Sequence, residues 1–128
     1  MLLVDDEPIF RDVGRELVQA TGGFVVAGEA DSGEAAVEAV AELVPDLVIM
    51  DRRMGALDGI SATRLITERH PGVAVLLVSV GPLEEGALDG SGALGFARKQ
   101  DLSPDLLRSW WQEWTMRTSE PRVRSARG

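Results

Sequence analysis

The sequence predicts a doubly wound α/β fold, in which a parallel sheet carries helices on both faces. Short apolar runs alternate with longer stretches whose apolar residues recur at helical spacing, and this alternation repeats five times. The runs are apolar throughout, which is typical of parallel strands buried on both faces. An alternating pattern of this kind favours one parallel sheet. With 128 residues, 45% of them hydrophobic, the chain has the size and composition of one domain with its own core.

Five apolar runs are the candidate strands, at residues 2–4, 24–27, 47–50, 73–78 and 93–97. The run at 73–78 is the longest and the richest in β-branched residues, which fit a strand well. For five such strands we expect the flavodoxin-like order 2-1-3-4-5, whose winding direction reverses between strands 1 and 3. Ligands bind at this switch point, outside the carboxyl ends of the strands.

The first three helices are indicated by apolar periodicity. The first carries a stripe at spacing four, formed by Ile9, Val13 and Leu17, and Asp6 is expected to cap its start. The second is indicated by apolar residues at i, i+3, i+4 and i+7, namely Val37, Val40, Ala41 and Val44. The third is expected over residues 60–70.

The fourth helix is predicted to be short or irregular, whereas the fifth has clear start signals. The segment between Ser79 and Lys99 is crowded with helix-breaking residues, namely Gly81, Pro82, Gly86, Gly90 and Gly92. The last helix should begin with Ser103 as its N-cap and Pro104 at its first helical position. We expect it to fray after about residue 114.

The last helix is unusually aromatic, which leaves two interpretations open. Leu106, Trp110 and Trp114 form one stripe at spacing four, and Leu107 with Trp111 forms a second beside it. Either both stripes are buried in a wide core contact, or at least one tryptophan is exposed. An exposed aromatic patch would predict self-association or partner docking through Trp110, Trp111 or Trp114.

Composition and charge exclude several classes of protein. The chain has no cysteine, so disulfides and thiolate metal sites are ruled out, and no apolar run is long enough for a membrane helix. The net charge of −8 disfavours nucleic-acid binding by the domain. The N-terminus lacks the pattern of a signal peptide, so the cytoplasm is the expected location. We expect residues 1–116 to form the domain and 117–128 to be a disordered basic tail.

Polar residues interrupt the pattern at the carboxyl ends of four predicted strands, namely Asp5 and Asp6, Asp51, Ser79 and Lys99. Singly, these residues have ordinary explanations such as helix caps, turns or solvated charges. Together they would place three carboxylates at the switch point, where mutual repulsion calls for a cation, and oxygen ligands suit Mg²⁺. With Ser79 and Lys99 holding phosphoryl oxygens, Asp51 would act as the nucleophile that forms an aspartyl-phosphate.

Four separated motifs occur in order along the chain. They read LLVDDEP at 2–8, VIMDRRM at 48–54 with Asp58-Gly59 following, LVS at 77–79 and GALGFARK at 92–99. These motifs resemble those of the receiver domains of two-component response regulators, in particular receivers attached to transcription regulators. The resemblance spans about residues 1–114 and implies a two-component phosphorelay protein. It implies that Asp51 accepts a phosphoryl group from a sensor histidine kinase or phosphotransfer protein and that Asp5, Asp6, Asp51 and the backbone carbonyl of Arg53 hold Mg²⁺.

The resemblance also assigns the remaining site residues. Ser79 would bind a phosphoryl oxygen through its hydroxyl, and Lys99 would pair with the phosphoryl group. Phe96 stands at the position of a switch aromatic, and a plain core residue of the fifth strand would look the same. The family signals through the surface of its fourth helix, fifth strand and fifth helix.

Three departures from the family pattern keep a second function open. Gln100 and Gly55 replace prolines, so the Lys99–Gln100 bond is expected to be trans with the lysine placed differently, and the loop after Asp51 is expected to be looser. Val80 is bulkier than the usual residue after Ser79. The alternative to a phosphoacceptor is a phosphorylation-independent, receiver-like interaction module. An aspartate-nucleophile phosphatase is disfavoured because Arg53 stands where such enzymes carry a second acid, so no turnover of external substrates is expected.

Overall fold

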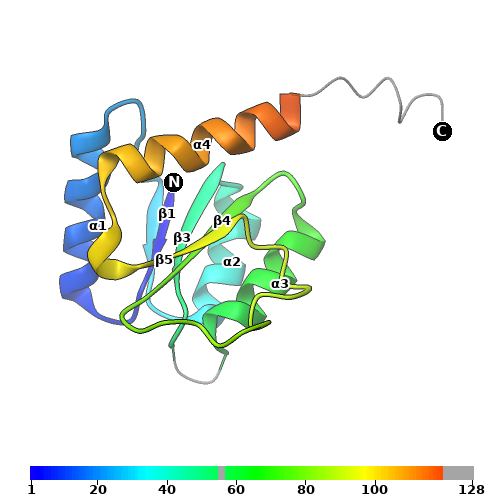
Figure 1. Cartoon of the computed structure of the whole chain (residues 1–128). Helices are drawn as coiled ribbons and strands as arrows, with labels where there is room; N and C mark the ends of the chain where they lie inside the picture. Colours follow the sequence, from blue (N-terminus) through cyan, green and yellow to red (C-terminus); the bar gives the residue numbers. More distant parts are fainter. Residues whose placement is uncertain (55–56, 120–128) are drawn as a thin grey trace.

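One five-stranded parallel sheet forms the centre of the protein in the computed structural model, which describes residues 1–54 and 57–119 (Figure 1). The strand order is β2-β1-β3-β4-β5, as predicted, and every neighbouring pair is parallel. The strands are β1 (Leu2–Val4), β2 (Gly28–Ala30), β3 (Leu47–Asp51), β4 (Ala74–Ser79) and β5 (Gly95–Arg98). The strands β1, β3 and β4 are buried along their whole length, which explains their uninterrupted apolar sequence.

In the described part of the chain, four helices cover the two faces of the sheet, which gives three layers (Figure 1). The helices α2 (Gly33–Leu43) and α3 (Gly59–Arg69) pack on one face, and α1 (Pro8–Thr21) and α4 (Pro104–Ser119) pack on the other. Each face has its own core cluster, with Val40 and Ile66 fully buried in the first and Val18 and Leu107 in the second. Each such side chain stabilises the fold by about 1.5–3 kcal/mol. Among the helices of the described ranges, none has the length and apolar character of a membrane span.

The second strand lies later in the sequence than the apolar run at 24–27 predicted. Ladder pairing with β1 begins at Leu2↔Gly28 and ends at Val4↔Ala30. The run itself lies beside Met1, whose backbone carbonyl accepts from the Ala27 N–H at 2.7 Å and whose amino group donates to the Val25 carbonyl at 2.9 Å. The prediction was wrong because pairing with β1, and not local hydrophobicity, decides which residues form β2.

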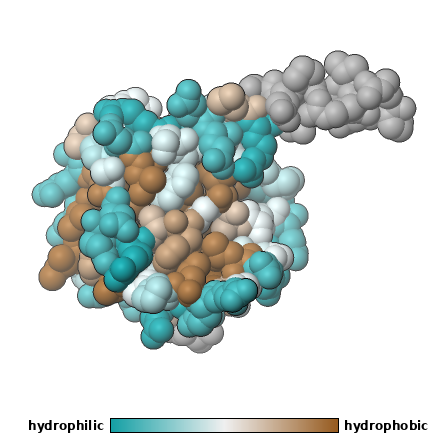
Figure 2. Space-filling view, viewed as in Figure 1, coloured by the Kyte–Doolittle hydropathy of each residue, from teal (hydrophilic) through white to brown (hydrophobic). Residues whose placement is uncertain are grey.

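Helix α1 differs from its prediction in its cap and in its buried face. Its N-cap is Glu7, without a side-chain cap, so Asp6 does not cap the helix. Ile9 and Val13 of the predicted stripe are 72% and 45% exposed. The helix instead approaches the sheet through Gly14, where a Cβ would lie only 3.1 Å from Leu3. Figure 2 shows apolar surface on the side where Figure 1 places α1.

The connection between β4 and β5 contains no regular helix, as the glycine-rich sequence predicted. Residues 80–94, all of which the structure describes, form turns and bends. Three backbone hydrogen bonds between residues three apart close successive turns, and Gly86, Gly90 and Gly92 adopt positive φ. The segment is fastened at two points: Arg52 pairs with Glu84 at 2.5 Å, and the Thr67 hydroxyl donates to the Ser91 carbonyl at 2.9 Å.

Helix α4 begins as predicted, and its tryptophans belong to the core. The Ser103 hydroxyl accepts from the Leu106 N–H at 3.1 Å, and Leu107 is fully buried. All three tryptophans, Trp110, Trp111 and Trp114, are partly buried and pack against the second core cluster. The expectation of an exposed tryptophan was wrong, so the predicted self-association loses the aromatic patch on which it depended.

The end of α4 also differs from the prediction. The helix continues to Ser119 and does not end near residue 114. The first three residues of the predicted tail, 117–119, are therefore helical. Residues 120–128 of that tail, and Gly55 with its expected loop, lie outside the described residues.

Candidate functional site

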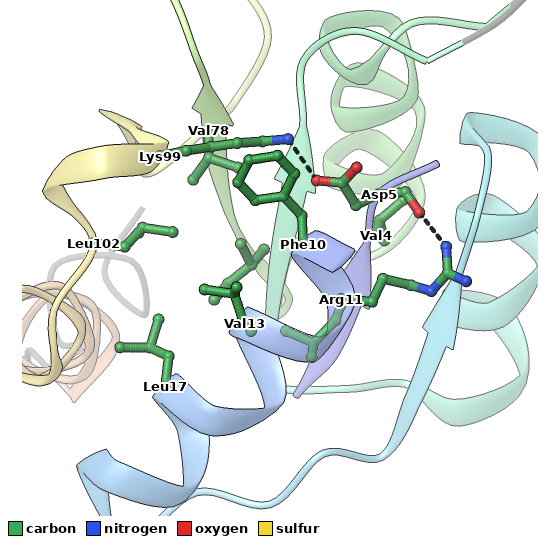
Figure 3. A pocket seen from close by; sticks show the side chains of 12 residues that line it. Val4, Asp5, Phe10, Arg11, Val13, Leu17, Val78, Lys99 and Leu102 are labelled. Atoms are coloured by element: carbon green, nitrogen blue, oxygen red, sulfur yellow. Dashed lines mark hydrogen bonds and ion pairs between the residues drawn. The ribbon is translucent and has the colours of Figure 1, made fainter. Parts of the chain in front are cut away.

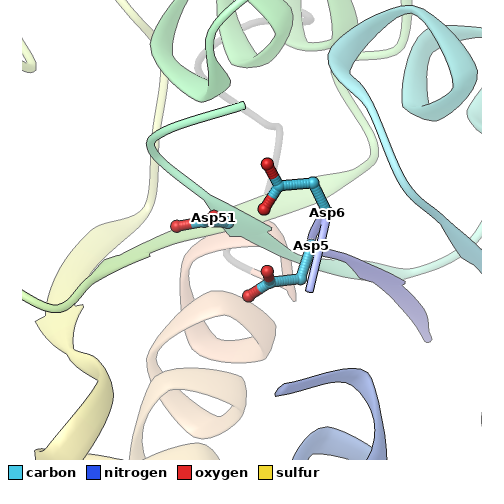
Figure 4. Close-up of side chains that lie close together, drawn as sticks. All are labelled: Asp5, Asp6 and Asp51. Atoms are coloured by element: carbon cyan, nitrogen blue, oxygen red, sulfur yellow. The ribbon is translucent and has the colours of Figure 1, made fainter. Parts of the chain in front are cut away.

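Three carboxylates meet at the carboxyl ends of β1 and β3, as the sequence predicted (Figure 4). The two strands pair up to Val4↔Met50, so Asp5 and Asp51 are the next residues on adjacent strands. One oxygen from each of Asp5, Asp6 and Asp51 lies within 4.8 Å of the other two, a spacing that could hold a metal ion. Asp5 and Asp51 are buried and Asp6 is exposed, so the cluster opens to solvent on one side.

Local hydrogen bonds hold Asp5 in place. Its Oδ1 accepts from the Glu7 N–H at 2.9 Å, and its own N–H donates to the Ala30 carbonyl at 3.1 Å. Arg11 of α1 donates to the Asp5 backbone carbonyl at 2.6 Å. These bonds fix the turn between β1 and α1, so the carboxylate is carried by a rigid backbone.

Asp51 is held by the close approach of α3. Asp58 caps this helix by accepting from the Ser61 N–H at 2.8 Å. The next residue must be glycine, because a Cβ on Gly59 would lie 2.1 Å from the Asp51 carbonyl oxygen. The Asp58-Gly59 motif therefore has a structural cause: it brings the start of α3 against the end of β3.

The cluster is short of positive charge. The pKa of Asp51 is raised from 3.8 to about 6, chiefly by burial and next by the negative charge of Asp5, while Lys99 acts in the opposite direction. Lys99 Nζ lies 2.7 Å from Asp5 Oδ2 and 3.6 Å from Asp51 Oδ1. The pKa of Asp51 is raised in spite of Lys99, which indicates an excess of negative charge that a cation bound among the carboxylates would neutralise.

Lys99 reaches the site although no proline follows it. The residue opens a short 3-10 turn, Lys99–Asp101, directly after β5, and the Lys99–Gln100 peptide bond is trans. Its side chain is only 6% exposed, and its ammonium lies over the ring of Phe10. The trans bond is as expected with glutamine in place of proline, and Lys99 still reaches both carboxylates.

Ser79 completes an open pocket at this edge of the sheet. Ser79 is the last residue of β4 and is buried. The pocket is lined by residues from four connections, namely Asp6, Glu7, Asp51, Arg53, Ser79, Val80, Gly81, Pro82 and Lys99. Val80 is 60% exposed and lies at the same pocket, where the sequence expects it to narrow access to Asp51. The predicted nucleophile, hydroxyl and lysine thus share one cavity open to solvent.

Two residues of this region were not singled out by the sequence, and one predicted residue lies apart. Phe10 and Arg11 both contact the site from the first turns of α1. Their position five and six residues after Asp5, on the helix that leaves the acidic edge, is the signal that would have found them. Phe96 lies in β5, partly buried against the first core cluster.

The family model of the response regulator receiver domain matches residues 1–106. The chain belongs to this family. As a receiver domain it is a module of two-component signal transduction. It is 41% identical over 105 residues to the two-component response regulator ORR41 of Oryza sativa subsp. japonica, covering 77% of this chain and 81% of that one. It is 38% identical over 80 residues to the response regulator GacA of Pseudomonas viridiflava, covering 62% of this chain.

Solved receiver domains share its architecture. The receiver domain of NarL from Mycobacterium tuberculosis superposes with a TM-score of 0.78 at 28% identity, covering 89% of this chain and 94% of that one. The response regulator domain of Thermotoga maritima CheB gives a TM-score of 0.77 at 30% identity, with the same coverage of both chains. The chain spans only 37% of the length of GacA, so the receiver domain is the part that the two share.

Proposed function

We propose that Asp51 is the phosphoacceptor of this receiver domain, with a sensor histidine kinase or phosphotransfer protein as donor. In the proposed step, an Asp51 carboxylate oxygen bonds to phosphorus while the bond from phosphorus to the donor's histidine nitrogen breaks. The electron pair of that bond leaves with the nitrogen, and an aspartyl-phosphate results. The proposal rests on one observation above all: Asp51 shares a solvent-open pocket with Ser79 and Lys99, beside two further carboxylates.

We propose Mg²⁺ as the cation of the acidic cluster, held by Asp5, Asp6, Asp51 and the backbone carbonyl of Arg53. The donor set supports this assignment, because carboxylate and carbonyl oxygens are the ligands that Mg²⁺ prefers. When bound, the ion supplies charge neutralisation for the phosphoryl oxygens. Asp5 and Asp51 contribute preorganised carboxylates, since both are buried and held by backbone hydrogen bonds.

Ser79 and Lys99 are proposed to bind the phosphoryl oxygens that Asp51 does not contact. The Ser79 hydroxyl would donate to one oxygen, and the Lys99 ammonium would leave Asp5 to pair with another.

Phe96 is proposed as the residue on β5 that responds to this change, through its contact with the first core cluster. The exposed Ile9 and Val13 of α1 lie near this edge and offer an apolar surface to the protein donor.

We further propose that the protein works in the cytoplasm without turnover of external substrates and without binding DNA through this chain. Arg53, two residues after Asp51, supports the absence of turnover, because an aspartate-nucleophile phosphatase carries an acid there. The net charge of −8 disfavours contact with nucleic acid. All the proposed site residues lie within residues 1–116, the predicted receiver unit, and α4 continues three residues beyond it.

Intact-mass measurement after incubation with acetyl phosphate and Mg²⁺ tests the function directly. The wild-type protein should gain one phosphoryl group as acetate leaves, and Asp51→Asn should gain none. Asp46→Asn is the matched control, because Asp46 is an exposed aspartate that immediately precedes the other end of β3. An unchanged wild-type mass at saturating donor, with Mg²⁺ binding confirmed, would reject the proposal and favour the phosphorylation-independent interaction module.

A further inference from the structure

The ring of Phe10 lies against the ammonium of Lys99 at the acidic edge. Phe10 stands in the first turn of α1, and Lys99 Nζ is 3.6 Å from the centroid of its ring. Figure 3 shows the ring beside the end of the lysine side chain, with Asp5 at the tip. The same nitrogen is 2.7 Å from Asp5 Oδ2 and 3.6 Å from Asp51 Oδ1, so an aromatic face and two carboxylates surround it.

This contact is attractive, and burial strengthens it. The face of an aromatic ring carries negative charge density, which attracts a cation, and the attraction grows when water is excluded. The Lys99 side chain is only 6% exposed. Phe10 therefore holds the ammonium by an interaction that an aliphatic side chain of similar size cannot make.

The two carboxylates hold the charged end of Lys99, and the ring of Phe10 adds a further restraint on a flexible side chain. A lysine side chain is a flexible four-carbon stem, and its ammonium can rotate. Lys99 opens a short 3-10 turn and is followed by Gln100 instead of the family's proline. A cavity of about 40 Å³ lies beneath it, lined by Phe10 together with Val13, Leu17 and Leu102 (Figure 3). Without the ring, the aliphatic part of the Lys99 side chain has room to enter this cavity.

We propose that Phe10 is a positioning residue for phosphoryl transfer, whose ring holds the Lys99 ammonium between Asp5 and Asp51. From there the ammonium can leave Asp5 and pair with an incoming phosphoryl oxygen while its side chain stays against the ring. Phe10 acts through the lysine and does not touch the reacting atoms. The inference rests on the proposed function of Asp51 and Lys99 and adds to it a residue of α1 that sets the geometry.

The sequence offers a clean probe, because Lys99 is the only lysine among the 128 residues. In protein grown with ¹³C-labelled lysine, the side chain therefore gives a single εCH₂ resonance. The ring current of Phe10 should shift this resonance upfield in the wild type. Phe10→Leu should lose the shift, and Phe10→Tyr, which keeps the ring, should retain it.

The same variants test the consequence for the reaction. The rate of phosphorylation by acetyl phosphate should fall about tenfold in Phe10→Leu, the size that a desolvated cation–π contact supports, and should recover in Phe10→Tyr. Pentafluorophenylalanine at position 10 keeps the shape of the side chain and reverses the charge on its face, so it should lower the rate without disturbing the fold. Phe24→Leu is the matched control, because Phe24 is a partly buried phenylalanine that contacts Trp111.

The outcomes separate the positioning role from the proposed function. A wild type that accepts no phosphoryl group contradicts the function of Asp51, while the lysine resonance still reports whether the contact exists. A wild-type resonance without an upfield shift overturns the positioning role. An unchanged rate with pentafluorophenylalanine also overturns it, and this variant decides the matter if Phe10→Leu does not fold.

Discussion

The two halves of the sheet are connected in different ways. In the half formed by β2, β1 and β3, each strand is followed by a regular helix, whereas β4 is followed by the turns of residues 80–94 (Figure 1). The acidic edge belongs to the first half, where burial and local hydrogen bonds from backbone N–H groups hold the carboxylates of Asp5 and Asp51. The segment 80–94 is fastened by a few contacts, among them Arg52–Glu84 and Thr67–Ser91.

The comparison shows that the acidic edge forms without a regular helix after β4. The carboxylates depend on β1, β3 and the approach of α3, none of which includes that helix. The family's signalling surface includes the fourth helix, so we expect any response of this protein to phosphorylation to use a different surface.

Gly92→Ala should have the largest effect on stability. Gly92 has φ +81°, and a Cβ there would lie 2.3 Å from Thr67 Oγ1, which fastens the segment to α3. Positive φ and the clash together should cost about 2–4 kcal/mol of unfolding free energy. Gly90→Ala is the control, because Gly90 has φ +74° and nothing within 4 Å of the added Cβ. Urea denaturation that gives equal losses for both variants would show that the segment is not fastened at Thr67.

Asp51→Asn should stabilise the Mg²⁺-free protein at neutral pH by about 1–3 kcal/mol, since each pKa unit is worth about 1.4 kcal/mol. Burial, followed by the charge of Asp5, raises the pKa of Asp51 to about 6, so the folded state holds this proton more tightly than the unfolded state. The stabilisation that protonated Asp51 gives to the folded state is fully present below about pH 4 and is lost as the pH rises through 6. The variant should lack this decline.

Denaturation in chelator-containing buffer between pH 4 and 8 measures the effect, with Asp46→Asn as the control. Added Mg²⁺ should then stabilise the wild type more than Asp51→Asn, because the variant has lost one carboxylate of the cluster. Parallel pH curves for wild type and Asp51→Asn would contradict the electrostatic account of the acidic edge.

Val80→Ala should have the smallest effect on stability. It should instead make Asp51 more accessible to a phosphodonor. Val80 lies where the acidic edge meets the segment 80–94, and its side chain is 60% exposed. Truncation of so exposed a residue should change the unfolding free energy by less than about 0.5 kcal/mol. The initial rate of phosphorylation by acetyl phosphate should rise, because the pocket becomes wider. A rate equal to that of the wild type would mean that Val80 does not limit access to Asp51.

The strand order and the acidic cluster at the carboxyl edge could both be predicted from the sequence. Uninterrupted apolar runs identify parallel strands, and the topology of five such strands brings the ends of β1 and β3 together. Asp5, Asp6 and Asp51 could therefore be placed side by side without coordinates. The absence of a regular helix after β4 was also predictable, because glycine and proline act locally on the backbone.

Which residues pair between strands and which helix faces are buried depend on contacts between distant parts of the chain. The second strand is Gly28–Ala30 and not the more hydrophobic 24–27, because pairing with β1 sets its position. Ile9 is exposed because α1 contacts the sheet through the face that carries Gly14. The tryptophans of α4 are partly buried because that helix packs on the sheet beside Gly95, which Trp110 contacts. The contact of Phe10 with Lys99 joins residues 89 positions apart, and no local pattern encodes so distant a contact.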